Sequence, residues 1–248
     1  LQSTATSTLD ETEAFELVQQ AAEQGIAEAQ TNLGLCYAEG RGVEADETQA
    51  VEWFAKAAEQ GELEAQWQLA QRMRAIDAVA ARKLFGQAAV QGVVFAQFAL
   101  AEMCAQGEGG EIDEDAATQW FRKAAEQGHA GAQNNLAERL VETNSAEAME
   151  WYEKAAEQNC VPAQYNLGRR LFEGDGQAAV HWLKLAAAAD HTEAQFLLGC
   201  ACGEGVDGEP NSIEAAKWFR KASEAGHGEA QWELTRQLQA VPGPVYVV

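Results

Sequence analysis

A short string that recurs along the whole chain constrains the fold more than any other feature. The string Ala-Ala-Glu-Gln-Gly occupies residues 21–25, and exact or degenerate copies occupy 57–61, 88–92, 124–128, 155–159, 186–190 and 222–226. Successive copies lie 36 or 31 residues apart. A period of this size indicates a repeat architecture, in which each unit is one supersecondary element that buries its apolar face against its neighbours.

A second motif follows each copy and has the spacing of an amphipathic helix. It reads Ala-Gln, two residues, then Leu, and it begins at Ala29, Ala65, Ala96, Ala132, Ala163, Ala194 and Ala230. In the first unit Ala29, Leu33 and Tyr37 recur at i, i+4 and i+8, which places them on one face of a helix, here called helix A. Gly34 lies beside Leu33, where a missing side chain lets a neighbouring helix approach closely.

The residues around each recurrent string predict another helix, helix B. Ala50, Trp53, Phe54 and Ala57 follow the i, i+3, i+4, i+7 pattern of an apolar helix face. A tryptophan recurs in the same register at Trp53, Trp120, Trp151, Trp182 and Trp218. Most B helices end at a Gly, Asn or Asp, the residue types that tolerate the left-handed conformation at a helix end.

The two unit lengths differ in the connection from helix A to helix B. The separation is 20 residues in a long unit, from Leu33 to Trp53, and 15 in a short unit, from Leu136 to Trp151. We expect the short units to lack most of the Gly-rich connection at 40–46, because packing constrains helix faces and tolerates variation in loop length. At the start of B helices, Asn144 and Asn211 each have a Glu three residues later, as in a capping box.

These patterns predict an all-α solenoid of stacked antiparallel helix pairs. The expected order is a lone helix B at about 10–24, six A–B pairs, and a final helix A at about 228–240. The expected organisation is therefore an N-terminal segment over 1–9, one solenoid over 10–240 and an extended tail over 241–248.

The repeat resembles that of the Sel-1-like repeat (SLR) family, relatives of the tetratricopeptide repeats. The segments Ala29–Val43 and Ala50–Gly61 carry the resemblance, which extends over residues 10–240. The three short units depart from the family pattern, and so does helix A at 66–74, where Ala70 and Met73 replace the usual Gly and Tyr. Membership implies a right-handed superhelix that acts as a protein–protein scaffold or adaptor, often in bacterial signalling, envelope processes or host interaction.

Charge narrows the class of partner. The chain has 39 acidic and 17 basic side chains, giving a formal net charge of −22. Such a surface disfavours nucleic acid and anionic membranes, and it favours basic proteins or peptides. No apolar run reaches the length of about 18–20 residues that spans a bilayer, so membrane insertion is not expected. Leu1–Thr8 has no signal-peptide core, and the compartment stays open between the bacterial cytoplasm and the periplasm or exterior.

By analogy with tetratricopeptide arrays, the A helices should line a concave groove that binds a peptide or a partner protein. Its candidate residues are Asn32, Trp67, Gln71, Arg74, Phe98, Asn135, Tyr165, Asn166, Arg169, Phe196 and Trp232. Aromatic rings offer rigid apolar contact, Asn amides pair with backbone groups, and arginines such as Arg74, Arg169 and the neighbouring Arg170 hold carboxylates. The alternative interpretation is that these residues serve packing and hairpin stability.

The C-terminal tail departs from the helical pattern. Pro242 and Pro244 exclude a helix, and Val245–Val248 is apolar and β-prone. The tail could support self-association, or it could be a frayed end.

The sequence contains no recognisable catalytic, cofactor or metal motif. No zinc-protease, nucleophile-elbow or phosphate-loop pattern occurs, and the histidines lack ligand spacing. His129 and His227 follow helix B at equivalent positions, so a repeated turn accounts for them. The five cysteines do not follow the repeat and are expected to be buried or half-buried thiols. We therefore predict no enzyme activity. The alternatives are a β-lactamase-like SLR protein, whose paired cysteines this chain lacks, and a self-assembling structural protein.

Overall fold

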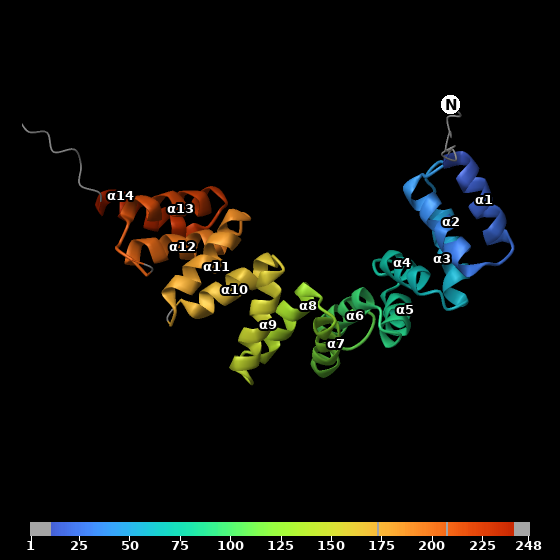
Figure 1. The fold of residues 1–248 in the computed structure, drawn as a ribbon, viewed down its shortest axis with the longest axis horizontal. Helices are drawn as coiled ribbons and strands as arrows, with labels where there is room; N and C mark the ends of the chain where they lie inside the picture. The colour runs from blue at the N-terminus through green and yellow to red at the C-terminus, as the bar shows by residue number, and fades with distance from the viewer. Residues whose placement is uncertain (1–10, 173, 207, 241–248) are drawn as a thin grey trace, which may run out of the picture. The chain divides into compact units, whose positions relative to one another are not determined.

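The structure, a computed structural model, describes residues 11–172, 174–206 and 208–240. These residues form fourteen α-helices joined by turns, with no strand among them (Figure 1). The helices are α1 (Glu11–Glu23), α2 (Ala27–Glu39), α3 (Glu47–Glu59), α4 (Leu63–Met73), α5 (Ala78–Val90), α6 (Val94–Gln106), α7 (Glu114–Glu126), α8 (Ala130–Leu140), α9 (Ser145–Glu157), α10 (Val161–Leu171), α11 (Gly176–Ala188), α12 (Thr192–Glu204), α13 (Ser212–Glu224) and α14 (Gly228–Ala240). The N-terminal segment and the tail of the sequence prediction lie outside the described residues.

The chain divides into two compact units, unit 1 (Leu1–Ala124) and unit 2 (Ala125–Val248). In unit 1 each helix from α1 to α6 packs on the next along the chain, and in unit 2 each helix from α8 to α14 does the same. Within unit 2, α10 also touches α12, which is the next helix A. Packing between chain neighbours is what a stack of helix pairs requires, so the predicted solenoid fold class is confirmed.

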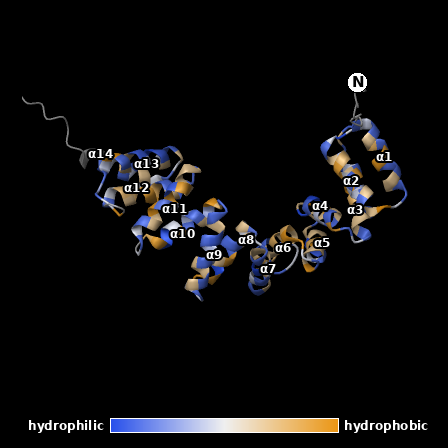
Figure 2. Cartoon of the chain, in the orientation of Figure 1, coloured by the Kyte–Doolittle hydropathy of each residue, from blue (hydrophilic) through white to orange (hydrophobic). Residues whose placement is uncertain are grey.

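The core of each pair consists of alanines around one large side chain from helix B. These large side chains, all buried, are Phe54, Phe85, Phe121, Tyr152, Leu183 and Phe219. The recurrent tryptophan one position earlier is only half-buried. The ammonium of Lys56 lies 3.7 Å from the ring centroid of Trp53, and Lys123 covers Trp120 in the same way. Each helix carries both buried and exposed positions, and Figure 2 shows hydrophobic and hydrophilic residues alternating along the helices.

A glycine on helix A allows helix B to pack closely, as predicted. A Cβ on Gly34 would lie 2.7 Å from Cε1 of the buried Phe54, and one on Gly199 would meet Phe219 at the same distance. Real Cβ atoms do not approach other atoms so closely, so the close A–B contact depends on the missing side chain.

The recurrent string and the Ala-Gln motif meet at each turn from helix B to helix A. The last residue of the string has positive φ in every unit: Gly25, Gly61, Gly92, Gly128, Asn159, Asp190 and Gly226. This confirms the predicted left-handed helix ends. The Gln side chain then donates from Nε2 to a carbonyl eight residues earlier, near the end of helix B, as Gln30 does to Ala22 at 3.2 Å. Gln66, Gln97, Gln133, Gln164 and Gln195 make the same bond.

The five-residue difference between units divides between a loop and a helix end. The long-unit helix α2 has 13 residues and a connection over 40–46, whereas the short-unit helix α4 has 11 residues and a connection over 74–77. The loop therefore loses three residues, and helix A loses two from its last turn. Both predicted capping residues are confirmed, because Asn144 and Asn211 accept from the N–H groups of Glu147 and Glu214.

Among the described residues, no helix combines the length and the apolar character needed to cross a bilayer.

Candidate functional site

Unit 1 contains five of the predicted binding residues, namely Asn32, Trp67, Gln71, Arg74 and Phe98. Asn32 and Gln71 are exposed, whereas both aromatic rings are half-buried against neighbouring helices. The Trp67 ring centroid lies 5.4 Å from that of Phe85, and the Phe98 centroid lies 5.8 Å from that of Phe121. These two side chains therefore contribute to packing between helix A and helix B.

Arg74, at the end of α4, already holds a carboxylate of its own chain. Its Nε and Nη2 donate to the two carboxylate oxygens of Glu108 at 2.6 and 3.0 Å, and its Nη1 lies 3.4 Å from Glu102 Oε2. The hydrogen bond from Arg74 lowers the pKa of the Glu108 carboxyl. The expected bidentate geometry is present, but it connects α4 to the loop after α6.

Unit 2 contains the other predicted residues, and two of their rings stack on histidines. The ring centroids of Tyr165 and His191 are 4.6 Å apart with an interplanar angle of 23°, and those of Phe196 and His227 are 4.1 Å apart at 18°. Each histidine begins the next helix A, so one aromatic stack connects successive A helices. Trp232, on α14, is 66% exposed and lies outside these stacks.

The predicted asparagines of unit 2 form a polar network beneath this surface. Asn166 Nδ2 donates to Asn134 Oδ1 at 3.1 Å and to Glu138 Oε1 at 3.0 Å, and Asn134 Nδ2 donates to Asn135 Oδ1 and to Glu138. Asn134 and Asn166 are both buried. The network connects α8 to α10.

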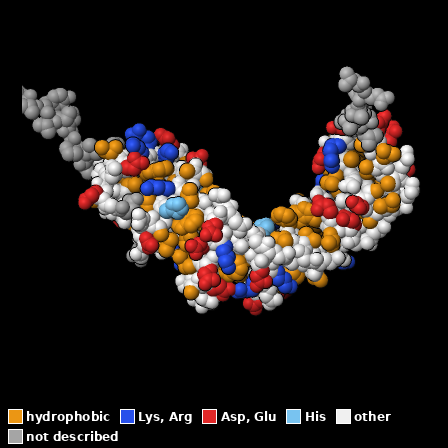
Figure 3. All heavy atoms as spheres, viewed as in Figure 1, with side chains coloured by type: hydrophobic (Ala, Val, Ile, Leu, Met, Phe, Trp, Pro, Cys, Tyr) orange, Lys and Arg blue, Asp and Glu red, His pale blue; other side chains and the backbone are white. Residues whose placement is uncertain are grey.

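Two adjoining grooves open on unit 2 and share Arg169 and Leu197. The first, here the arginine groove, has a volume of about 660 Å³ and is lined by Ser145, Met149, Arg169, Arg170, Phe172 and Leu197. The second, here the histidine groove, has a volume of about 510 Å³ and is lined by Tyr165, Arg169, Glu193, Phe196, Leu197, His227, Glu229 and two glycines. Figure 3 shows hydrophobic side chains beside Lys and Arg side chains over the α10–α12 part of unit 2.

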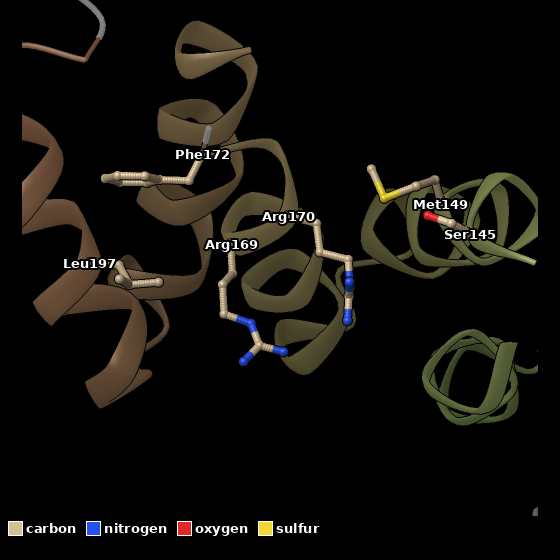
Figure 4. Close-up of a pocket in the computed structure, with 6 residues that line it drawn as sticks. All are labelled: Ser145, Met149, Arg169, Arg170, Phe172 and Leu197. Carbon is tan, nitrogen blue, oxygen red and sulfur yellow. The ribbon is translucent and has the colours of Figure 1, made fainter. Parts of the chain in front are cut away.

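The two arginines of α10 extend from the helix in the same direction (Figure 4). Phe172 and Leu197 lie on one side of them, and Met149 and Ser145 lie on the other. The Arg169 guanidinium lies 5.6 Å from the ring centroid of Tyr165, close enough for a cation–π interaction. Burial and Glu138 raise the pKa of the Tyr152 hydroxyl, whereas Arg170 and Arg169 lower it, which places positive charge near that hydroxyl.

Three histidines cap A helices of unit 2. The Nδ1 atoms of His129, His191 and His227 accept from the N–H groups three residues later, at 3.1, 3.2 and 3.3 Å. Burial lowers the pKa of His129 and His191, because it disfavours the charged imidazole. In unit 1 the carboxylate of Glu62 caps α4 in the same way. The sequence indicates the repeated turn but not this capping bond, because histidine is not a usual N-cap residue.

The grooves include residues that the sequence prediction missed. The predicted binding residues Tyr165, Arg169 and Phe196 line these grooves, and so do Ser145, Met149 and Phe172, from the start of α9 and the end of α10. Their place depends on how successive pairs stack, and no motif marks it. Unit 1 has a hollow of about 570 Å³ beside α3, α4 and α5, and no predicted binding residue lines it.

Within the described residues, no cluster of His, Cys, Asp or Glu has the arrangement of a metal site. The five cysteines are free thiols, and burial raises the pKa of Cys200 to about 11.

Comparison with known proteins identifies a repeat family. The family model "Sel1 repeat" matches residues 6–26, 27–62, 94–129, 130–160, 161–191 and 192–227. The unmatched stretch between 62 and 94 is the unit with the altered helix A, but α4 and α5 pack as a pair there too.

Two solved structures share the fold. The first is a protective antigen of uropathogenic Escherichia coli strains, described as displaying an SLR fold. It is 28% identical with a TM-score of 0.83 over 94% of this chain and 54% of its own. The second is a Sel1 repeat protein from Oxalobacter formigenes, which is 32% identical with a TM-score of 0.74 over 92% of this chain and 70% of its own.

A curated relative, named an exopolysaccharide production negative regulator, comes from Rhizobium meliloti. It is 47% identical over 57 residues, which are 23% of this chain and 21% of the relative. The chain thus spans about half the length of the Escherichia coli antigen, and it matches about a fifth of this regulator.

Proposed function

The chain belongs to the Sel1-repeat family, and we propose that it is a non-catalytic scaffold or adaptor that binds another protein in the two grooves of unit 2. Proteins with Sel1 repeats typically mediate protein–protein interactions, and their solenoids are generally non-catalytic. The proposed bound element is an extended segment of the partner, lying along α10 and α12.

The stacked pairs Tyr165–His191 and Phe196–His227 are the observation that carries this proposal. They hold two half-buried rings rigidly at the edge of an open groove, so apolar contact with a partner costs little side-chain entropy.

Site-directed photo-crosslinking tests the location. A photoreactive phenylalanine derivative replaces Leu197, which both grooves share, and in a second protein it replaces the exposed Ile213 on α13. We expect a discrete crosslinked partner from position 197 and none from position 213. Equal crosslinking from both positions, or crosslinking from position 213 alone, would contradict the assignment to the grooves.

A separate measurement addresses the enzymatic alternative. If the protein is a scaffold, the purified chain leaves the chromogenic β-lactam nitrocefin unchanged. Steady turnover that tracks the protein through purification would overturn the non-catalytic assignment.

A further inference from the structure

The charge of the arginine groove is opposite to that of the whole chain. The formal net charge is −22, yet among the described residues that line this groove the charged ones are Arg169 and Arg170. Neither arginine forms an ion pair with any residue that the structure describes. In the described part of the lining, two guanidinium groups thus face the groove and no carboxylate does, although the chain has 39 acidic residues.

The described neighbours engage these arginines only in part, because Arg170 interacts with the uncharged hydroxyl of Tyr152. Glu138, a nearby acid, accepts from Asn134 and Asn166, which occupy one of its carboxylate oxygens. The Tyr165 ring supports Arg169 without using its N–H donors. By contrast Arg74, which follows α4 in unit 1, is neutralised by Glu108. An arginine guanidinium pairs most strongly with a planar anion that accepts two parallel hydrogen bonds, as a carboxylate does.

We propose that the arginine groove recognises an acidic residue, Asp or Glu, in the segment that the protein binds. This inference rests on the proposed function and adds the chemical class of the bound segment. Phe172, Leu197 and Met149 flank the arginines, so an apolar side chain next to the acidic residue completes the match (Figure 4). The bound element is thus a protein segment that pairs a carboxylate with an adjacent apolar side chain.

The net charge does not oppose this assignment. Solution ions screen exposed charges beyond about 8–10 Å at physiological salt, so acidic side chains farther than this from the two arginines act only weakly inside the groove. A nucleic acid carries many phosphates along its backbone, and the acidic surface around the groove would repel them. A single carboxylate needs to contact only the groove itself. The net charge therefore disfavours polyanions, but it does not disfavour a single acidic side chain.

Selection from a random peptide library tests the proposal on the full chain. Peptides displayed on phage are selected on the immobilised protein, and the selected sequences are synthesised for isothermal titration calorimetry. Each peptide is measured beside an analogue in which Asp or Glu becomes Asn or Gln, and beside one with phosphoserine at that position. We expect the selected peptides to share an acidic residue next to an apolar one. The amide analogues should bind about tenfold more weakly or worse, as loss of hydrogen bonds to a charged group predicts.

Variants assign the effect to the two arginines. R169Q/R170Q should bind the acidic peptide about tenfold more weakly and should no longer distinguish it from its amide analogue, because the charge-assisted bonds are lost. R169K/R170K keeps the charge without the planar fork and should be intermediate. R220Q changes an exposed arginine on α13 and should bind as the natural chain does. Because the substituted side chains are exposed, we expect each variant to fold. Circular dichroism and Tm measurements check this.

The outcomes separate the two proposals. If the Kd of the selected peptides is the same for the amide analogue, or the same for R169Q/R170Q as for the natural chain, the acidic-segment inference fails and the scaffold proposal stands. A preference for the phosphoserine analogue, or a basic consensus, also overturns the inference. If the folded protein selects no peptide at all, both proposals fail.

Discussion

The imidazole of His191 stacks on the ring of Tyr165, with centroids 4.6 Å apart, and its Nδ1 accepts from the N–H of Ala194 at 3.2 Å. An acceptor at Nδ1 requires a neutral imidazole whose proton is on Nε2. One side chain thus begins α12 and supports an aromatic wall of the histidine groove. His227 and Phe196 repeat this relationship one unit later.

The histidine caps should weaken in acid. Burial lowers the folded-state pKa of His129 and His191 below the ordinary value of 6.5, so the unfolded chain takes up their protons more readily. Their stabilisation is complete above the unfolded pKa and is lost as the pH falls through the folded pKa. We expect the double variant H129N/H191N, whose amides cap without titrating, to lose less Tm than the natural chain between about pH 8 and about pH 5.

A histidine that caps no helix provides the control for this experiment. His181 is exposed, lies in edge contact with the Trp182 ring and lies within α11 rather than at its cap, so H181N removes an imidazole without removing a cap and serves as the reference variant. Parallel Tm curves for H129N/H191N and the natural chain would contradict the capping account.

Substitution of Gly34 by alanine should destabilise the first A–B pair. The new Cβ would meet the buried Phe54 ring at 2.7 Å. Overpacking costs about 1–3 kcal/mol and outweighs a gain in helix propensity of about 1 kcal/mol. The matched control is G86A on α5, where nothing lies within 4 Å of the added Cβ, and which should therefore stabilise the protein. Urea unfolding measures both, and a stable G34A would refute the close-packing role.

The buried glutamine of the Ala-Gln motif should not tolerate a charge. In Q164E an isosteric carboxylate replaces the Nε2 donor that bonds Ala156 O at 3.2 Å, and it faces that carbonyl in a buried position. A buried, unpaired charged group predicts a loss of about 2–4 kcal/mol in the free energy of unfolding. Q231E, at the equivalent but exposed position of α14, should change the same quantity by less than about 0.5 kcal/mol. Chemical denaturation measures both variants, and an equal loss of unfolding free energy in Q164E and Q231E would contradict a specific role for the buried Gln164–Ala156 bond.

The thiol of Cys200 should react slowly in the folded protein. Burial raises its pKa to about 11 from a reference of 9.0, so the reactive thiolate is about a hundredfold rarer at neutral to mildly alkaline pH. Iodoacetamide labelling followed by peptide mass spectrometry should show that Cys200 is modified much more slowly in the folded protein than in urea. The same labelling rate in both states would contradict the burial of this thiol.

The repeat spacing predicts most of the fold because each unit packs only on its neighbours. The left-handed residue at 25 and its counterparts, the glycine at 34 and the caps at Asn144 and Asn211 follow from residue type and position alone. The sequence does not predict that helix A is two residues shorter in α4. Removing two residues from the helix or two from the loop leaves the same spacing between the motifs.

The grooves are harder to derive from the sequence than the fold. Tyr165, Arg169 and Phe196 occupy repeat positions that periodicity identifies, and they do line the grooves. Arg74 looks equivalent by residue type, yet Glu108 neutralises it from a loop 34 residues later. Whether an arginine faces an open groove or a carboxylate depends on one neighbouring loop, and repeat spacing does not encode that contact.

The most direct test of the central claim is hydrogen–deuterium exchange of the full chain with and without a saturating peptide from the library selection. If unit 2 binds an extended segment along the arginine and histidine grooves, slower exchange appears in α10 and in the first turns of α12. Protection confined to α3–α5 around the hollow of unit 1, with α10 and α12 unchanged, would contradict the account.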